Sequence, residues 1–178
     1  MRKLRNEELD RLTPDEVKEA AKHPLVIVLD NVRSRHNVGS AFRTADAFLC
    51  EKILLCGITA QPPHREIHKT ALGSTDTVAW EYRENSMDAI DDLKQKGFKI
   101  VSIEQADESV SLEQFQIQGS EKLALVFGNE VKGVSESVVE ASDYVIEIPQ
   151  FGTKHSLNIS VSIGIVLWDL ICKLKFNT

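Results

Sequence analysis

The sequence predicts an α/β domain with a mainly parallel sheet that is flanked by helices. Short apolar runs rich in β-branched residues alternate along the chain with stretches whose apolar residues recur at helical spacing. LVIVLD at 25–30 is one such run, typical of a buried parallel strand. The 178 residues are 42% apolar and 27% charged, which suits a single domain and excludes disordered, collagen-like and coiled-coil classes.

The first elements of the chain are predicted from their caps and periodicity. Thr13, Pro14 and Glu16 form an N-cap pattern with proline in the first turn, so a helix is expected up to about Lys22. Strand 25–30 follows, and then a helix over 38–48 with Val38, Phe42, Ala45 and Phe48 or Leu49 on one face. A strand at 52–57 leads into a Pro-rich loop with a short helical turn.

The second half of the chain continues the same alternation. Ser86 caps a helix that ends at Gly97, and SESVVEA at 135–141 is a short helix. LNISVSIGIVLWDLICKLK at 157–175 forms one long apolar helix. The remaining predicted strands are VAWEY (78–82), FKIVSI (98–103), KLALVF (122–127) and DYVIEI (143–148).

The sequence also indicates where in the cell the protein is located. The N-terminal MRKLRNEELDRL has no apolar segment behind its basic residues, and no apolar run approaches the roughly 18 residues of a membrane span. We therefore expect a cytoplasmic protein with no membrane association, whose single domain over 1–178 begins with a helical extension at 1–22. Cys50, Cys56 and Cys172 lie among apolar neighbours and are expected to be reduced and packed.

Charge is segregated along the chain. The net charge of −6 by itself argues against a polyanionic partner, which needs a positive surface. However, residues 31–70 sum to +3 and 148–178 to +2, while 71–147 carry −10. The ordinary explanation of such segments is a solvated face, because segregation in sequence does not require segregation in space.

Common cofactor motifs are absent. The loop after strand 25–30 has one glycine where a dinucleotide-binding fingerprint needs three, and there is no G-x-S-x-G. GNEVKGVS at 128–135 has P-loop glycine spacing, but Val134 replaces the phosphate-binding lysine. His64 and His68 have the spacing of a zinc helix, although Glu66 occupies the wrong position between them. No metal is expected, and a metal-dependent hydrolase is kept as a rival hypothesis.

Three polar segments that follow predicted strands carry the candidate chemistry. The first contains Asn37, Gly39, Arg43, Thr44 and Ala45, the second Gly128, Glu130 and Gly133, and the third SLNISV at 156–161. Together they resemble the three motifs of the SpoU (TrmH-like) family of RNA ribose 2'-O-methyltransferases, within the SPOUT superfamily. The resemblance covers residues 25–172 and implies a C-terminal deep trefoil knot that binds S-adenosylmethionine.

The resemblance implies which residues contact the cofactor. They are Gly128, Ile148 and Leu157, with Ile103 and Glu104 as weaker candidates. Gly128 suits this role because a missing side chain lets a ligand approach the backbone closely. For Ile148 and Leu157, the residues by themselves favour plain core packing.

The resemblance also implies a catalytic role for Arg43, with Asn37, Glu130, Ser156 and Asn158 positioning it and the RNA. A guanidinium is a poor base, so Arg43 acts either as that base or by gripping a phosphate and stabilising the developing alkoxide. Alternatives from the residues alone are a surface ion pair between Arg43 and Asp46, and an N-cap role for Asn37.

A structured RNA, tRNA rather than rRNA, is the expected substrate, and a homodimer is implied by the family. We expect no separate RNA-binding domain before the first strand, and therefore expect the methyltransferase domain itself to bind RNA. The apolar helix at 157–175 agrees with a dimer, since it must be covered on most sides. A knotted module that binds RNA or cofactor without catalysis is the alternative. The expected RNA-binding residues are Arg33, Arg35, His36, Arg65, His68, Lys69 and Lys154.

Overall fold

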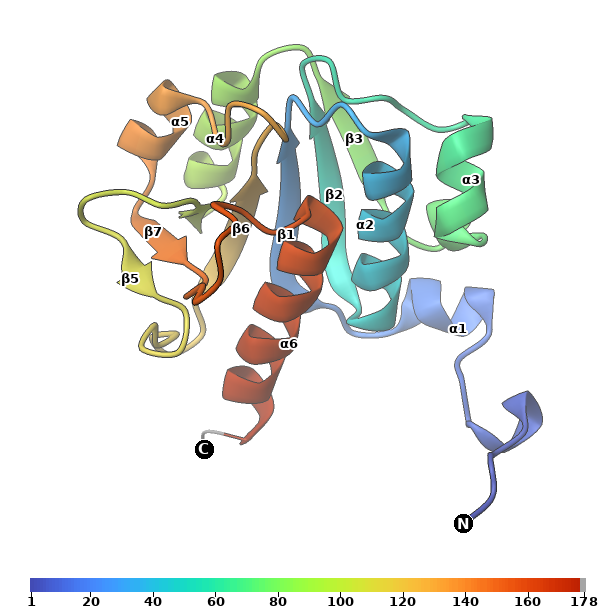
Figure 1. Cartoon of the computed structure of the whole chain (residues 1–178). Coiled ribbons are helices and arrows are strands. Elements are labelled where there is room, and N and C mark those ends of the chain that lie inside the picture. Colours follow the sequence, from blue (N-terminus) through green and yellow to red (C-terminus); the bar gives the residue numbers. More distant parts are fainter. Residues whose placement is uncertain (177–178) are drawn as a thin grey trace.

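A seven-stranded sheet forms the centre of the protein in a computed structural model that describes residues 1–176 (Figure 1). Its order is β3-β2-β1-β6-β4-β7-β5, and every strand pair is parallel. The predicted α/β class with a mainly parallel sheet is therefore confirmed. The strands are β1 (His23–Asp30), β2 (Cys50–Cys56), β3 (Trp80–Arg83), β4 (Phe98–Ile103), β5 (Val110–Ser111), β6 (Lys122–Phe127) and β7 (Tyr144–Glu147).

Helices cover both faces of the sheet. One apolar core lies between the sheet and α2, α3 and α6, and the other lies between the sheet and α4 and α5 (Figure 1). Because both faces are covered, residues 25–30 of β1 are buried, and all of them are apolar until Asp30. The helices are α1 (Pro14–Glu19), α2 (Arg35–Ala47), α3 (Arg65–Ala71), α4 (Ser86–Gln95), α5 (Glu136–Ala141) and α6 (Ile159–Phe176), with 3-10 turns at Asn6–Glu8 and Ser74–Asp76.

Most predicted elements are present, with corrections at their ends. The Thr13–Glu16 capping box is confirmed, but α1 ends at Glu19 rather than Lys22. The cap of α4 is Asn85, whose side chain accepts from the Met87 N–H, and Ser86 is the first helical residue. Strand β5 was not predicted, because two residues carry no readable periodicity.

Two helices also begin elsewhere than predicted. Helix α2 starts at Arg35, three residues early, because Ser34 caps it by accepting from the Asn37 N–H. Helix α6 starts at Ile159 because Asn158 accepts from the Ser160 N–H and so caps it.

The three cysteines are free thiols, as the sequence predicted. Cys50 and Cys56 are buried in β2, and burial raises the pKa of each thiol to about 12. Thiols held in this state are poor nucleophiles. Cys172 is half-buried on α6.

Asp30 joins the end of β1 to the two helices on one face. It is fully buried and accepts from Ser86 Oγ at 2.5 Å, from Ser135 N and Oγ at 2.8 and 2.6 Å, and from Asn31 Nδ2 at 2.8 Å. These donors satisfy both side-chain oxygens, as a buried polar group requires. The junction fixes where the loop after β1 begins.

Strand order brings the functional loops together. β6 lies between β1 and β4, and β7 pairs with the other edge of β4. Because all four strands are parallel, their carboxyl ends lie side by side, and the segments that follow them leave the sheet at that same end. Loops separated by more than 100 residues in the chain therefore surround the same space.

Candidate active site

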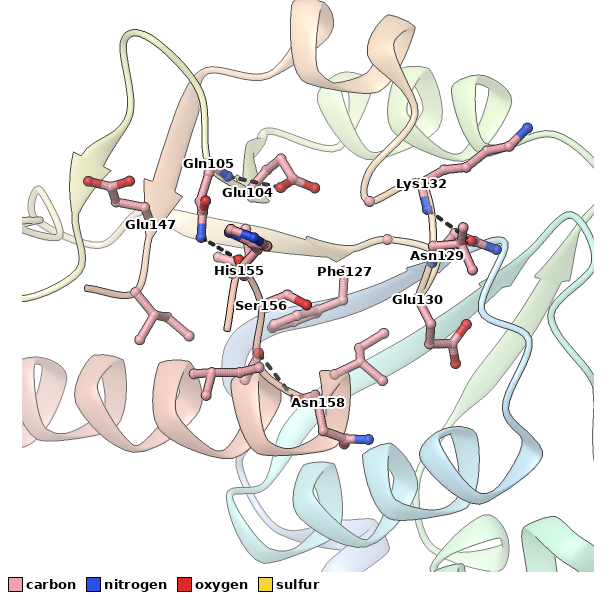
Figure 2. Close-up of a pocket in the computed structure, with 18 of the residues that line it drawn as sticks. Glu104, Gln105, Phe127, Asn129, Glu130, Lys132, Glu147, His155, Ser156 and Asn158 are labelled. Atoms are coloured by element: carbon pink, nitrogen blue, oxygen red, sulfur yellow. Dashed lines mark hydrogen bonds between the residues drawn. The ribbon is translucent and has the colours of Figure 1, made fainter. Parts of the chain in front are cut away.

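A cleft of about 570 Å³ lies at the carboxyl ends of β4, β6 and β7, beside the first turn of α6 (Figure 2). Ligands of open α/β sheets bind at this edge, and the volume is within the range of small-molecule sites. Its walls come from residues 103–105, 127–133, 147–148 and 155–159, with Gln150 and Ser162.

All five residues expected to contact a cofactor line this cleft: Ile103, Glu104, Gly128, Ile148 and Leu157. Ile103 and Ile148 are also partly buried against the core, so packing accounts for part of their character. Leu157 is 37% exposed, and plain core packing does not explain it. Together these side chains form an apolar wall beside the polar loops.

Gly128 is required by its own loop. A Cβ at this position would lie 2.1 Å from the carbonyl carbon of Gly133 and 2.1 Å from the nitrogen of Val134. Asn129 and Gly133 exchange two backbone hydrogen bonds of 2.8 Å, which fold residues 128–134 back on themselves. The sequence led us to expect that a ligand would approach the backbone of Gly128 closely. In the structure, the backbone of residues 133 and 134 makes that close approach.

Glu104 and Gln105 connect this loop to the segment before α6 (Figure 2). The Glu104 carboxylate accepts from the N–H groups of Val134 at 3.0 Å and Gln105 at 2.9 Å. Gln105 Nε2 donates to the carbonyl oxygen of His155 at 3.0 Å. The two residues after β4 therefore hold in place both the loop 128–134 and the segment before α6, which form two sides of the cleft.

Glu130 joins the second motif to the first. Its carboxylate accepts from the backbone N–H groups of Arg33 and Ser34, both at 2.9 Å, and from Asn37 Nδ2 at 3.0 Å. Burial opposes ionisation, but the hydrogen bonds from Arg33, Ser34 and Asn37 outweigh it and hold the pKa of Glu130 below its ordinary value. Its negative charge lies at the N-terminus of α2, where the helix dipole stabilises an anion.

Asn37 and Asn158 extend this chain of hydrogen bonds to the third motif. Asn158 Nδ2 donates to Asn37 Oδ1 at 3.3 Å, while Asn158 Oδ1 caps α6. Asn37 is 8% exposed, and the prediction that it caps α2 is wrong, because Ser34 does so. Three segments that are distant in the sequence therefore share one polar network.

Arg43 lies outside the cleft. It is exposed on α2, six residues beyond Asn37, and its side chain forms no hydrogen bond or ion pair within residues 1–176. The alternative ion pair with Asp46 is not formed; Asp46 accepts instead from Thr77 Oγ1. Ser156, in contrast, lines the cleft.

The expected RNA-binding residues are all exposed and lie mainly on α2 and α3. The two helices pack closely, since Thr70 Oγ1 donates to the His36 carbonyl at 3.0 Å and a Cβ on Gly39 would lie 2.1 Å from that oxygen atom of Thr70. Arg35 Nη1 is 3.5 Å from Glu66 Oε2 across this contact. The set comprises Arg33, Arg35 and His36 at the start of α2, Arg65, His68 and Lys69 on α3, and Lys154 before α6.

Several lining residues were not predicted, namely Gln105, Asn129, Lys132, Glu147 and His155. Gln105 and Asn129 lie two residues after predicted strands, and Glu147 is the last residue but one of the predicted strand 143–148; this position is the signal that could have found those three. His64, half of the rival zinc pattern, accepts from the Glu66 N–H through Nδ1 and caps α3. Within the described part of the chain, no three His, Cys, Asp or Glu side chains meet as metal ligands.

The model of the SpoU rRNA methylase family matches residues 24–168, which include all three motifs and every wall of the cleft. The chain belongs to the SpoU family. Among the relatives of this SpoU chain is a tRNA (guanosine(18)-2'-O)-methyltransferase from Aquifex aeolicus, 34% identical over 155 residues, which are 86% of this chain and 72% of the relative. A 23S rRNA (guanosine-2'-O-)-methyltransferase RlmB from Neisseria meningitidis is 30% identical over 86% of this chain and 60% of its own length.

Solved structures agree with the family assignment. The A. aeolicus TrmH/SpoU tRNA modifying enzyme superposes on the SpoU chain with a TM-score of 0.81 at 30% identity, over 92% of this chain and 82% of that one. An AdoMet-bound rRNA methyltransferase from Sinorhizobium meliloti superposes with a TM-score of 0.79 at 26% sequence identity, over 93% of this chain and 62% of that one.

In residues 1–176, no helix is both long and apolar enough to cross a membrane.

Proposed function

We propose that the chain transfers a methyl group from S-adenosylmethionine to a ribose 2'-OH of a structured RNA. The observation that carries this proposal is the hydrogen-bond network of Glu130, Asn37 and Asn158, which joins the three family motifs at one cleft. The named relatives methylate guanosine 2'-O positions in tRNA or 23S rRNA. We favour tRNA because the chain matches 72% of the length of the A. aeolicus tRNA enzyme but 60% of the length of the N. meningitidis rRNA enzyme.

The cleft residues suit S-adenosylmethionine. Ile103, Ile148 and Leu157 offer an apolar wall of the kind an adenine ring needs, and the folded loop 128–134 offers backbone groups at the opposite wall. When bound, the cofactor supplies an electrophilic sulfonium methyl group. Hydrogen bonds of Glu104 to Val134 and of Gln105 to His155 hold both walls in place, so the protein's contribution is to align the bound cofactor with the RNA.

A homodimer is the proposed assembly. Val161, Ile165 and Trp168 are 49%, 37% and 61% exposed and lie at i, i+4 and i+7 on α6, which gives one exposed apolar stripe. A second copy of α6 is a suitable cover, since the stripe carries no charge. A dimer would also supply Arg43, which lies outside the cleft of its own protomer, to the cleft of the other.

In such a site Arg43 would act on the RNA and not on the cofactor. Its guanidinium has no protein partner among the described residues and is free to pair with a phosphate beside the target ribose. Glu130, Asn37 and Asn158 have their polar atoms committed to one another, which supports a positioning role for them. The exposed basic residues of α2, α3 and Lys154 are proposed to hold the RNA backbone.

The connection between β4 and β6 supports the proposed trefoil knot. Its strand β5 pairs with the edge of β7 that faces away from β4, so the connection passes around β7. Lys173 Nζ of α6 donates to the Leu112 carbonyl at 2.6 Å, so α6 contacts this connection. One domain over 1–178 and a cytoplasmic location are part of the same proposal, consistent with relatives that act on tRNA and rRNA.

Transfer of labelled methyl from S-adenosylmethionine to purified tRNA and rRNA tests the proposal. We expect wild-type protein to label ribose in tRNA, Arg43→Ala to lose transfer, and its cofactor affinity to stay within a few-fold. Arg11→Ala, an exposed arginine outside the proposed RNA surface, is the matched control. Cofactor binding by wild type without transfer to any RNA pool would favour the non-catalytic module, and loss of cofactor binding in Arg43→Ala would refute its assigned place.

A further inference from the structure

The segment between β7 and α6 carries an aromatic side chain that the proposed function leaves without a role. Phe151 is 99% exposed, more than any other large apolar residue of the described chain except Met1. A phenyl ring in water forgoes the stabilisation that burial gives to a large apolar side chain. Single exposed apolar residues are common on protein surfaces, so the place of this ring must decide whether it has a function.

Phe151 lies on the rim of the cleft. Gln150, the residue before it, lines the cleft, and the chain returns to the lining at His155. Consecutive Cα atoms are about 3.8 Å apart, so the main chain of Phe151 is one residue step from the cleft wall. At the other end of the segment, Gln105 Nε2 donates to the His155 carbonyl oxygen at 3.0 Å (Figure 2). A nucleotide whose ribose enters the cleft therefore brings its own base, or that of a neighbour, to this rim.

The surroundings of the ring distinguish it from the apolar stripe of α6. Residues 151–158 are all exposed, and Thr153, Lys154 and His155 follow the phenylalanine closely in the chain. A protein interface has an apolar core, as the stripe of α6 offers. An aromatic ring beside a lysine is instead how proteins hold unpaired nucleic acid, because bases stack on the ring and the cation pairs with phosphate.

The space around the ring is open. With an exposure of 99%, the ring has both of its faces in solvent. A Cβ added to the next residue, Gly152, would meet no heavy atom within 4 Å. A planar base can therefore stack on Phe151 in the offset geometry that aromatic pairs prefer, without movement of the protein.

We propose that Phe151 is a stacking platform for an unpaired base of the RNA, at the methylated nucleotide or beside it. Lys154 holds the adjoining phosphate. This inference rests on the proposed function and adds a requirement to it, namely that the RNA is single-stranded where it crosses this rim. Every base has an aromatic face, so the ring provides affinity and places the ribose without selecting the base. Phe151 is thus a positioning residue.

Equilibrium binding of the RNA pool that wild-type protein methylates, measured for variants of Phe151, tests the proposal. Loss of one base–aromatic stack weakens binding by about 5- to 150-fold, and we expect Phe151→Ala to lie in this range, with a raised KM for RNA. Phe151→Leu keeps an apolar side chain without an aromatic face and should lose nearly as much. Phe151→Trp should retain binding, and bound RNA should quench the fluorescence of the added tryptophan.

Leu12→Ala is the matched control, because Leu12 is an exposed apolar residue that precedes α1. Cofactor affinity and unfolding temperature of Phe151→Ala should equal those of wild type, since the side chain is exposed. RNA binding within twofold of wild type in Phe151→Ala, or full binding in Phe151→Leu, would overturn the stacking role. So would a change from dimer to monomer in Phe151→Ala, which would assign the ring to a protein interface. Failure of wild-type protein to methylate any RNA would instead refute the proposed function.

Discussion

Replacement of Gly128 by alanine tests how the cofactor loop is built. The added Cβ would lie 2.1 Å from two backbone atoms of residues 133 and 134, about 1.4 Å inside normal contact, and neither atom belongs to a flexible side chain. Relief of the clash must separate Asn129 from Gly133 and Val134 from Glu104, which removes hydrogen bonds of 2.8, 2.8 and 3.0 Å. At about 1 kcal/mol each, the cost is about 3 kcal/mol.

Two measurements follow from this cost. For a chain of this size, about 3 kcal/mol lowers the unfolding temperature by about 6–12 °C. If cofactor binding requires the original loop, the dissociation constant from titration calorimetry should rise about 100-fold. Gly152→Ala is the control, since a Cβ there meets nothing within 4 Å and its φ is not in the left-handed region. An unfolding temperature like wild type in ligand-free Gly128→Ala would refute the backbone explanation and favour direct clearance for the ligand.

Two further predictions concern assembly and acid stability. Trp168→Glu should convert a dimer into a monomer in sedimentation experiments, because it places a charge in the apolar stripe of α6. The control Ile58→Glu, at an exposed site after β2, should leave the dimer intact. An unchanged dimer in Trp168→Glu would contradict the proposed interface. Burial opposes ionisation of Asp143, but hydrogen bonds from the Ile100 N–H at 2.8 Å and Lys99 Nζ at 2.9 Å hold its pKa below the ordinary value. Its contribution is present above the unfolded pKa near 4 and is lost as pH falls through the folded pKa, so urea midpoints should fall less between pH 5 and 3 in Asp143→Asn than in wild type.

The polar network changes which chemical role the motif residues are given. Glu130 accepts from two backbone N–H groups just before α2, Asn158 caps α6, and each also hydrogen-bonds to Asn37. These contacts account for their side-chain types without any contact to RNA. Loss of Glu130 or Asn158 would misplace the cleft walls and would not remove a reacting group. Arg43 is different, because its side chain has no protein partner among the described residues.

Local sequence predicted those parts of the fold that depend on neighbouring residues. The apolar runs of β1, β4 and β6 and the Thr13 capping box are where the sequence placed them. Element ends were less accurate. The sequence pattern could not decide between Ser34 and Asn37 as the cap of α2, because both residue types suit a cap and the choice depends on Glu130, which lies more than 90 residues away.

The candidate site divides in a similar way. The family motifs identified Gly128, Ile148 and Leu157 as cleft residues, and each lines the cleft. The motifs did not place Arg43 outside the cleft, nor Gln105 and His155 within it. Those positions follow from strand order and from hydrogen bonds between loops, which no local pattern contains.

By itself, the sequence determined the α/β class, the family and the set of polar side chains available for chemistry. Those properties depend on periodicity and residue type, which act over a few neighbouring positions. Only the tertiary structure decided which side chains are committed to one another and which remain free. Parallel strands β1, β4, β6 and β7 bring their carboxyl ends to one edge, and hydrogen bonds formed there occupy Glu104, Glu130, Asn37 and Asn158. Asn158, in the positive segment 148–178, hydrogen-bonds to Asn37, in the positive segment 31–70, so a net charge of −6 does not by itself exclude a basic surface beside the cleft.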